Sequence, residues 1–134
     1  MWGREKMIDH ASISVCDLEL SDVFYQNVLA PLGLLRLVDR ETAIGFGKSY
    51  PEFWLNLRVD MLSVEGNSGN HICLRAPTNE AVIAFYNIAI SHGGRCDGAP
   101  GERQAAVTTY FGAFIRDLDG NKIEAVCFPR MDAS

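Results

Sequence analysis

The chain has 134 residues, of which 48% are hydrophobic and 22% are charged, as expected for one soluble globular domain. Its 12 lysines and arginines are outnumbered by 17 aspartates and glutamates, so the net charge is -5 and no basic stripe for a nucleic-acid backbone is present. No apolar run is long enough for a membrane span, and residues 1–6 are not followed by the apolar segment of a secretory signal. We therefore expect a cytoplasmic protein with neither nucleic-acid nor membrane partners.

The four cysteines are widely separated and form no CxxC pair, which argues against a zinc ribbon or a thioredoxin-type motif. Two of them lie inside apolar, strand-like segments. We therefore expect reduced and mostly buried thiols.

An internal repeat organises the chain. A shift of 61 residues brings His10 onto His71, Phe24 onto Phe85 and Gly33 onto Gly94. Each copy opens with an alternating strand, continues with a helix and ends with three shorter strands. The pattern predicts an α+β fold of two tandem β-α-β-β-β modules, residues 7–64 and 68–128, within a single domain of residues 7–134.

The predicted elements follow in chain order. The first helix begins near Asp17 or Ser21, and the second has Thr78 or Asn79 as its N-cap. Glycines end both helices. We expect residues 98–104 to form a loose segment over a site, and residues 117–121 to form a hairpin turn. The predicted strands span 8–15, 34–39, 43–46, 52–58, 70–76, 95–97, 110–116 and 122–128.

Alternation within the strands predicts where polar side chains point. His10, His71 and Glu124 all project from the sheet face that the helices do not cover. If the two sheets curl into a cup around that face, the three side chains meet. Two imidazoles and one carboxylate suit a divalent metal ion with open coordination positions. The alternative is that these residues are polar groups with hydrogen-bond partners and no metal.

Four further residues are candidates for a role at the same site. Arg75 shares a strand face with His71 and could bind an anionic group of a substrate, or it could be an ordinary solvated arginine. Trp54 could form an aromatic wall or fill the core, and Asn56 shares its face. Tyr110 could act as an acid or a hydrogen-bond donor, but its face depends on a hairpin register that the pattern leaves open.

Several motifs together resemble the vicinal oxygen chelate superfamily. This family includes glyoxalase I, the bleomycin resistance proteins, the fosfomycin resistance transferases and the extradiol dioxygenases. The resemblance extends from Met7 to Phe128, and its most specific part is the segment 117–126. The motifs are Ile8-Asp9-His10, Phe24-Tyr25, Asn70-His71-Ile72 and Asp117-Leu118-Asp119-Gly120-Asn121-Lys122-Ile123-Glu124-Ala125-Val126.

The resemblance implies paired modules around a metal ion held by His10, His71 and Glu124. Glu124 and, from its position on the neighbouring strand, Tyr110 are the expected catalytic residues. The position that matches Glu124 in the first module is Trp54, which cannot bind a metal, so Glu52 or water would supply any fourth ligand. A three-ligand site then fits better than the four-ligand glyoxalase I pattern. Zinc, nickel, manganese and iron all remain candidates for the bound metal.

Two functions follow from the resemblance as expectations. The first is a metal-dependent enzyme (a lyase or isomerase, a transferase or a dioxygenase) that acts on a small molecule through oxygen chelation. The alternative is a metal-free protein that sequesters a small molecule, as the bleomycin resistance proteins do. The resemblance also implies a homodimer, in which the first module of each chain can pair with the second module of the other.

Overall fold

The computed structural model describes residues 7–129, and these form two β-α-β-β-β modules. The predicted α+β class and the two-module architecture are confirmed. The expectation about a secretory signal in residues 1–6 lies outside the described residues. Within residues 7–129, neither helix has the length and hydropathy needed to cross a membrane.

The first module is a four-stranded mixed sheet with the strand order β1-β4-β3-β2. The outer strand β1 runs parallel to β4, while β3 runs antiparallel to both β4 and β2. Its elements are β1 (Ala11–Val15), α1 (Leu18–Leu29), the short 3-10 helix η2 (Ala30–Leu32), β2 (Leu35–Asp39), β3 (Ala43–Gly47) and β4 (Phe53–Leu57).

The second module repeats this topology with the strand order β5-β8-β7-β6. The predicted loose segment 98–104 is wrong, because β6 continues through it to Gln104. β6 lies at the edge of its sheet, where register shifts at Gly98 and Gly101 accommodate the glycines and Pro100 without ending the strand. The elements are β5 (Ile72–Arg75), α2 (Asn79–Ser91), β6 (Arg95–Gln104), β7 (Thr109–Arg116) and β8 (Lys122–Cys127).

Both helices begin and end as local chemistry dictates. The Asp17 carboxylate accepts a hydrogen bond from the Leu20 amide at 3.0 Å, and the Thr78 hydroxyl accepts one from the Ala81 amide at 3.0 Å. After α2 the chain turns at Gly93, whose φ of 99° is in the left-handed region. The segment after α1 turns in the same way at Gly33, with a φ of 84°.

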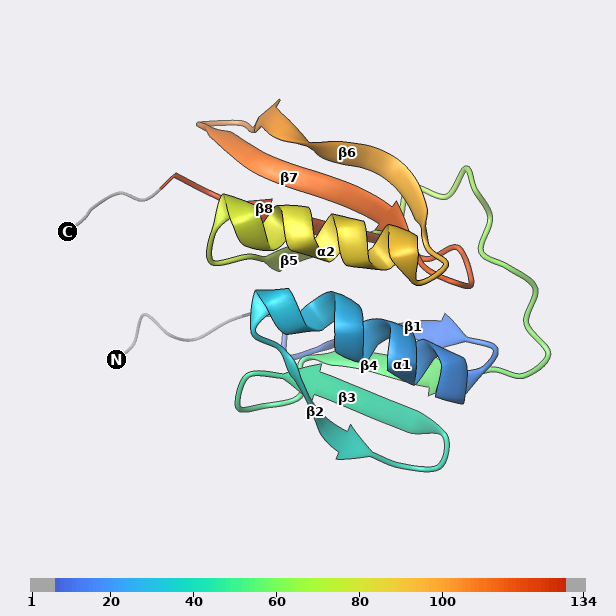
Figure 1. The fold of residues 1–134 in the computed structure, drawn as a ribbon. Helices are drawn as coiled ribbons and strands as arrows, with labels where there is room; N and C mark the ends of the chain where they lie inside the picture. The colour runs from blue at the N-terminus through green and yellow to red at the C-terminus, as the bar shows by residue number, and fades with distance from the viewer. Residues whose placement is uncertain (1–6, 130–134) are drawn as a thin grey trace.

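The two helices pack against each other and form a layer between the two sheets (Figure 1). One continuous core results, in which Phe24 and Tyr25 of α1 and Phe85 of α2 are buried together with the inner faces of β4, β7 and β8. The other face of each sheet therefore points away from the rest of the chain. The predicted cup is not closed within one chain, because the strands form two separate four-stranded sheets.

The polar turn of residues 117–121, between β7 and β8, holds the second module against the end of β1 in the first module. The Asn121 side-chain nitrogen Nδ2 donates to the Ser14 carbonyl oxygen at 2.9 Å, and the Cys16 backbone amide donates to the Asp119 carboxylate at 3.1 Å. From α1, the Tyr25 hydroxyl donates to the buried Asp117 carboxylate at 2.5 Å. The segment 117–121 is the predicted turn, and the structure shows that it also ties the second module to the first.

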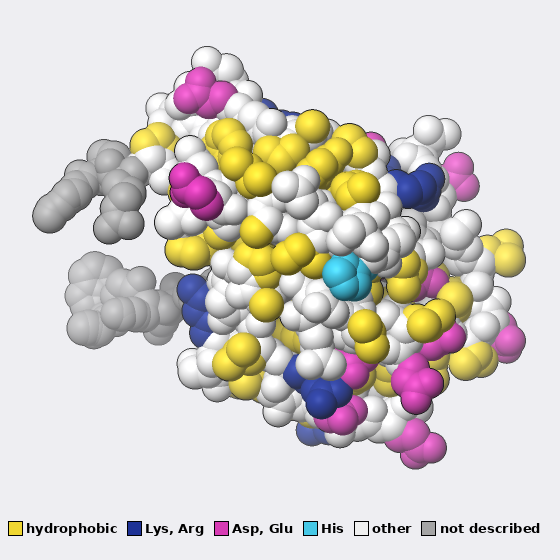
Figure 2. Space-filling view, in the orientation of Figure 1, with side chains coloured by type: hydrophobic (Ala, Val, Ile, Leu, Met, Phe, Trp, Pro, Cys, Tyr) yellow, Lys and Arg dark blue, Asp and Glu magenta, His cyan; other side chains and the backbone are white. Residues whose placement is uncertain are grey.

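The cysteines are free, as expected, but the prediction that most are buried is wrong. Cys16, Cys73 and Cys96 are exposed and Cys127 is partly buried. Hydrophobic side chains also reach the surface on the helix side of the molecule, where they gather over the second module (Figure 2).

Candidate functional site

The outward face of the second sheet brings His71, Tyr110 and Glu124 together. His71 Nε2 lies 3.0 Å from Glu124 Oε1, and the Tyr110 hydroxyl donates to Glu124 Oε2 at 3.1 Å. Glu124 is only 4% exposed although it lies on an uncovered face. Both of its carboxylate oxygens therefore have a partner on this face.

Strand register explains this arrangement. Cys73 of β5 is paired with Glu124 of β8, so the residue two positions before Cys73, His71, projects on the same side. β7 is paired with β8 so that Phe114 is opposite Glu124, and Tyr110, four residues earlier, shares that face. The register that the sequence pattern left open thus places the Tyr110 hydroxyl on the carboxylate.

Burial and the adjacent carboxylate alter two groups next to Glu124. Burial, followed by the hydrogen bond to Glu124, raises the pKa of Tyr110, which keeps this hydroxyl protonated as a donor. Although the Cys73 residue is exposed, desolvation of its thiol beside the sheet and the charge of Glu124 raise the pKa of this thiol to about 12. Cys73 is therefore a neutral thiol rather than a nucleophilic thiolate at neutral pH.

Aromatic rings and one cation surround the carboxylate. The His71 ring packs against Phe114 with centroids 5.6 Å apart, and the Tyr110 ring lies 5.5 Å from Phe128. The Arg75 guanidinium lies over the Phe128 ring, 5.3 Å from its centroid. Among residues 7–129, no carboxylate forms an ion pair with Arg75.

The corresponding face of the first module has a tryptophan in place of the glutamate. Trp54 is paired with Ser12 and Asn56 with Ser14 across β4 and β1, as Glu124 is paired with Cys73. The Arg40 guanidinium lies 5.7 Å from the centroid of the Trp54 ring. Trp54 and Asn56 thus lie on the predicted face, and the first module offers no carboxylate equivalent to Glu124.

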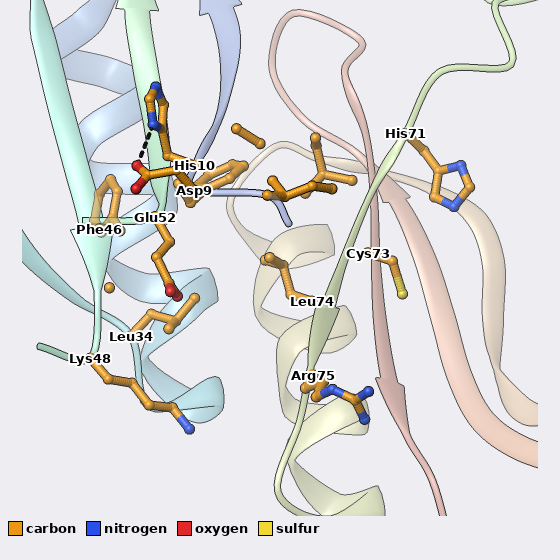
Figure 3. Close-up of a pocket in the computed structure, with 15 residues that line it drawn as sticks. Asp9, His10, Leu34, Phe46, Lys48, Glu52, His71, Cys73, Leu74 and Arg75 are labelled. Atoms are coloured by element: carbon orange, nitrogen blue, oxygen red, sulfur yellow. Dashed lines mark hydrogen bonds and ion pairs between the residues drawn. The ribbon is translucent and has the colours of Figure 1, made fainter. Parts of the chain in front are cut away.

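His10 lies apart from His71 and Glu124. Both histidines border a pocket of about 520 Å³ between the modules, which Glu52 also lines, but their side chains project away from each other (Figure 3). Within residues 7–129, no three His, Cys, Asp or Glu side chains are close enough to hold one metal ion. The donor types suit a divalent metal, and one chain brings two of the three predicted donors together.

Sequence reasoning missed two residues beside His10. Its Nδ1 lies 2.8 Å from Asp9 Oδ1, and the same carboxylate accepts a hydrogen bond from the Tyr50 hydroxyl at 2.9 Å. Both hydrogen bonds lower the pKa of Asp9, with the larger effect from His10. The acidic residue directly before His10 was a signal, but nothing in the sequence pattern pointed to Tyr50.

Comparison with known proteins identifies the family. The model of the glyoxalase/bleomycin resistance protein/dioxygenase superfamily matches residues 7–125. The chain belongs to this superfamily. The resemblance drawn from the sequence motifs is therefore confirmed. No curated protein matches the chain significantly.

Solved structures of the superfamily share the fold over almost the whole chain. A glyoxalase/bleomycin resistance protein from Albidiferax ferrireducens is 30% identical with a TM-score of 0.80, over 91% of this chain and 99% of that one. The fosfomycin resistance protein FosX from Listeria monocytogenes is 15% identical with a TM-score of 0.66, over 93% and 95%. A FosX mutant complexed with Mn(II) and a dihydroxypropylphosphonic acid is 16% identical with a TM-score of 0.65, over 90% and 89%.

Proposed function

We propose that the chain is a metal-dependent enzyme of this superfamily, which acts on a small molecule whose oxygen atoms bind a divalent metal ion. The observation that supports this most is the 3.0 Å approach of His71 Nε2 to Glu124 Oε1 on an uncovered sheet face. An imidazole nitrogen and a carboxylate oxygen at this separation can both bind one ion. The complex of a FosX mutant with Mn(II) supports a divalent metal in a protein of the same fold.

The third ligand in this proposal is His10 of the partner subunit. His10 and His71 of one chain line the same pocket but project away from each other, which supports a site that a second chain completes (Figure 3). In this proposal, the uncovered sheet face of the first module and that of the second module each form one half of a cup. A two-fold dimer that places the first module of one chain against the second module of the other would close two equivalent cups.

The residues around this site have distinct roles in the proposal. When bound, a divalent ion polarises a substrate oxygen and stabilises the negative charge that develops on it. The Tyr110 hydroxyl, kept protonated beside Glu124, donates a hydrogen bond to Glu124 or a proton to the substrate. Arg75 binds an anionic group of the substrate.

The first module of the partner would supply the opposite wall. Trp54 offers a flat apolar surface, and Asn56 offers an amide that can both donate and accept. Because Trp54 occupies the place of a carboxylate, Glu52 or a water molecule would complete the coordination of the ion. Three protein ligands leave coordination positions for two substrate oxygens, as chelation requires.

Metal analysis of the purified full-length chain tests the proposal. We expect stoichiometric binding of Mn(II), measured by calorimetry, and its loss in His71→Ala and in Glu124→Ala. His92→Ala is the matched control, because His92 caps the end of α2 and its Nδ1 lies 2.9 Å from the Ile88 carbonyl oxygen, away from the site. Equal metal binding by wild type and His71→Ala would exclude the proposed centre.

The same experiment distinguishes the alternative function. A metal-free protein that binds an aromatic or cationic small molecule equally well with and without His71 would be a sequestering protein of the bleomycin resistance type. The aromatic lining of Phe114, Phe128 and Tyr110 is the observation that favours this alternative.

A further inference from the structure

His10 takes part in a three-residue hydrogen-bonded array on the first module. Its Nδ1 is 2.8 Å from Asp9 Oδ1, and the Tyr50 hydroxyl lies 2.9 Å and 3.2 Å from the two oxygens of the same carboxylate. An ionised carboxylate can only accept hydrogen bonds, so in neutral His10 the proton must be on Nδ1. The lone pair is then on Nε2, the nitrogen without a partner in the array.

The first copy of the repeat contains this array, and the equivalent positions of the second copy do not. Asn70 stands before His71 as Asp9 stands before His10, but the contact of Asn70 is made by its backbone amide, with the Ser68 hydroxyl. In His71 it is Nε2 that faces a carboxylate, that of Glu124. The two histidines are therefore held by opposite ring nitrogens.

The backbone around Tyr50 supports the array. Tyr50 lies in the tight turn between β3 and β4, and after this turn the Glu52 carbonyl oxygen accepts a hydrogen bond from the Ala11 amide at 2.9 Å. This bond joins the turn to the residue directly after His10. The phenol and the imidazole thus reach the Asp9 carboxylate from two segments that the sheet holds together.

We propose that Asp9, itself held by Tyr50, is a positioning residue that fixes the Nδ1–H tautomer of His10 and presents Nε2 as the ligand nitrogen. The ligand role rests on the proposed function, whereas the tautomer does not. Carboxylates that accept the second N–H of a metal-binding histidine commonly change metal affinity 10- to 100-fold when they are removed.

Nitrogen-15 NMR of the metal-free full-length protein tests the tautomer directly. We expect the Nδ1–H form for His10 in the wild type, with its signals assigned by their loss in His10→Ala. In Asp9→Ala we expect a shift toward the Nε2–H form, and in Tyr50→Phe a smaller shift in the same direction. Asn70→Ala is the matched control at the equivalent repeat position and should leave His10 unchanged.

Mn(II) titration of the same variants measures the consequence. Asp9→Ala should weaken binding by about 10- to 100-fold, Tyr50→Phe by less, and Asn70→Ala not at all. A wild-type His10 in the Nε2–H form, or one whose tautomer is the same in Asp9→Ala, would overturn the inference. If no form binds Mn(II) while the tautomer shifts as expected, the proposed function fails and the positioning of His10 stands.

Discussion

At the residue scale, Asp117 is a buried ionisable group that is surrounded by hydrogen-bond donors. Its side chain is almost fully buried and accepts hydrogen bonds from the Tyr25 hydroxyl, from the Asn121 side chain and from the backbone amides of Asp119 and Asn121. Burial nevertheless outweighs these donors and raises the pKa of Asp117 above its ordinary value. The turn of residues 117–121, which holds the two modules together, therefore contains a buried carboxyl group that is costly to ionise.

This shift has a predictable effect on stability. A carboxyl group with a raised pKa in the folded state stabilises the protein fully below its unfolded pKa, and that contribution is lost as the pH rises through the folded pKa. Asp117→Asn should lower the free energy of unfolding by about 1–3 kcal/mol, because donors lose their acceptor. The difference from wild type should shrink between pH 4 and pH 7 in urea denaturation.

The control for this prediction is Asp60→Asn, at an exposed position in the turn after β4. It should change the stability little at either pH. A difference between wild type and Asp117→Asn that grows with rising pH would contradict the assigned direction of the pKa shift.

At the scale of elements, the turn between β3 and β4 depends on Gly47. A Cβ at this position would lie 1.9 Å from the Tyr50 carbonyl oxygen, which is backbone and cannot move without opening the turn. The turn carries Tyr50 to the Asp9 carboxylate and places Glu52 beside the pocket. The local geometry of this turn therefore affects both the stability of the first module and the setting of His10.

We predict that Gly47→Ala destabilises the protein by about 1–3 kcal/mol, as overpacking of a closed site does. The melting temperature should fall by several degrees, and the His10 signals should shift as they do in Tyr50→Phe. Gly66→Ala is the control, because a Cβ there meets nothing within 4 Å. Equal melting temperatures for the two variants would show that the turn tolerates a side chain.

At the scale of the whole molecule, the helices determine what one chain can do. Because α1 and α2 pack against each other and each covers its own sheet, the sheet faces with Glu124 and with Trp54 are the ones that the helices do not cover (Figure 1). In the proposed dimer, a second chain closes the cup over each of these faces. The proposed dimer follows from this arrangement, and it needs no change in the core of the chain.

Light scattering should therefore give the mass of a homodimer at working concentrations, and a monomer would contradict the proposed assembly. Mixing His10→Ala chains with Glu124→Ala chains should restore one intact Mn(II) site per mixed dimer, whereas neither variant alone should form one. If mixed dimers form but never bind Mn(II), the two modules do not exchange between chains. Mixed His71→Ala and Glu124→Ala chains are the control, because both ligands come from the same module and no intact site can form.

The sequence by itself was sufficient for the repeat, the α+β class, most elements and the face on which each candidate residue other than Tyr110 lies. These features depend on local alternation and on capping residues such as Asp17 and Thr78, which act within a few residues of chain. The superfamily motif in 117–126 was also readable, because a tight turn between two strands needs particular residues at particular places.

Only the tertiary structure decided how these parts meet. Tyr110 reaches Glu124 because the β7–β8 register places both on one face, and β6 continues past Pro100 because an edge strand tolerates bulges. His10 and His71 line one pocket between the modules, but their side chains point away from each other (Figure 3). Long-range packing of this kind depends on the whole core, and no local pattern of residues specifies it.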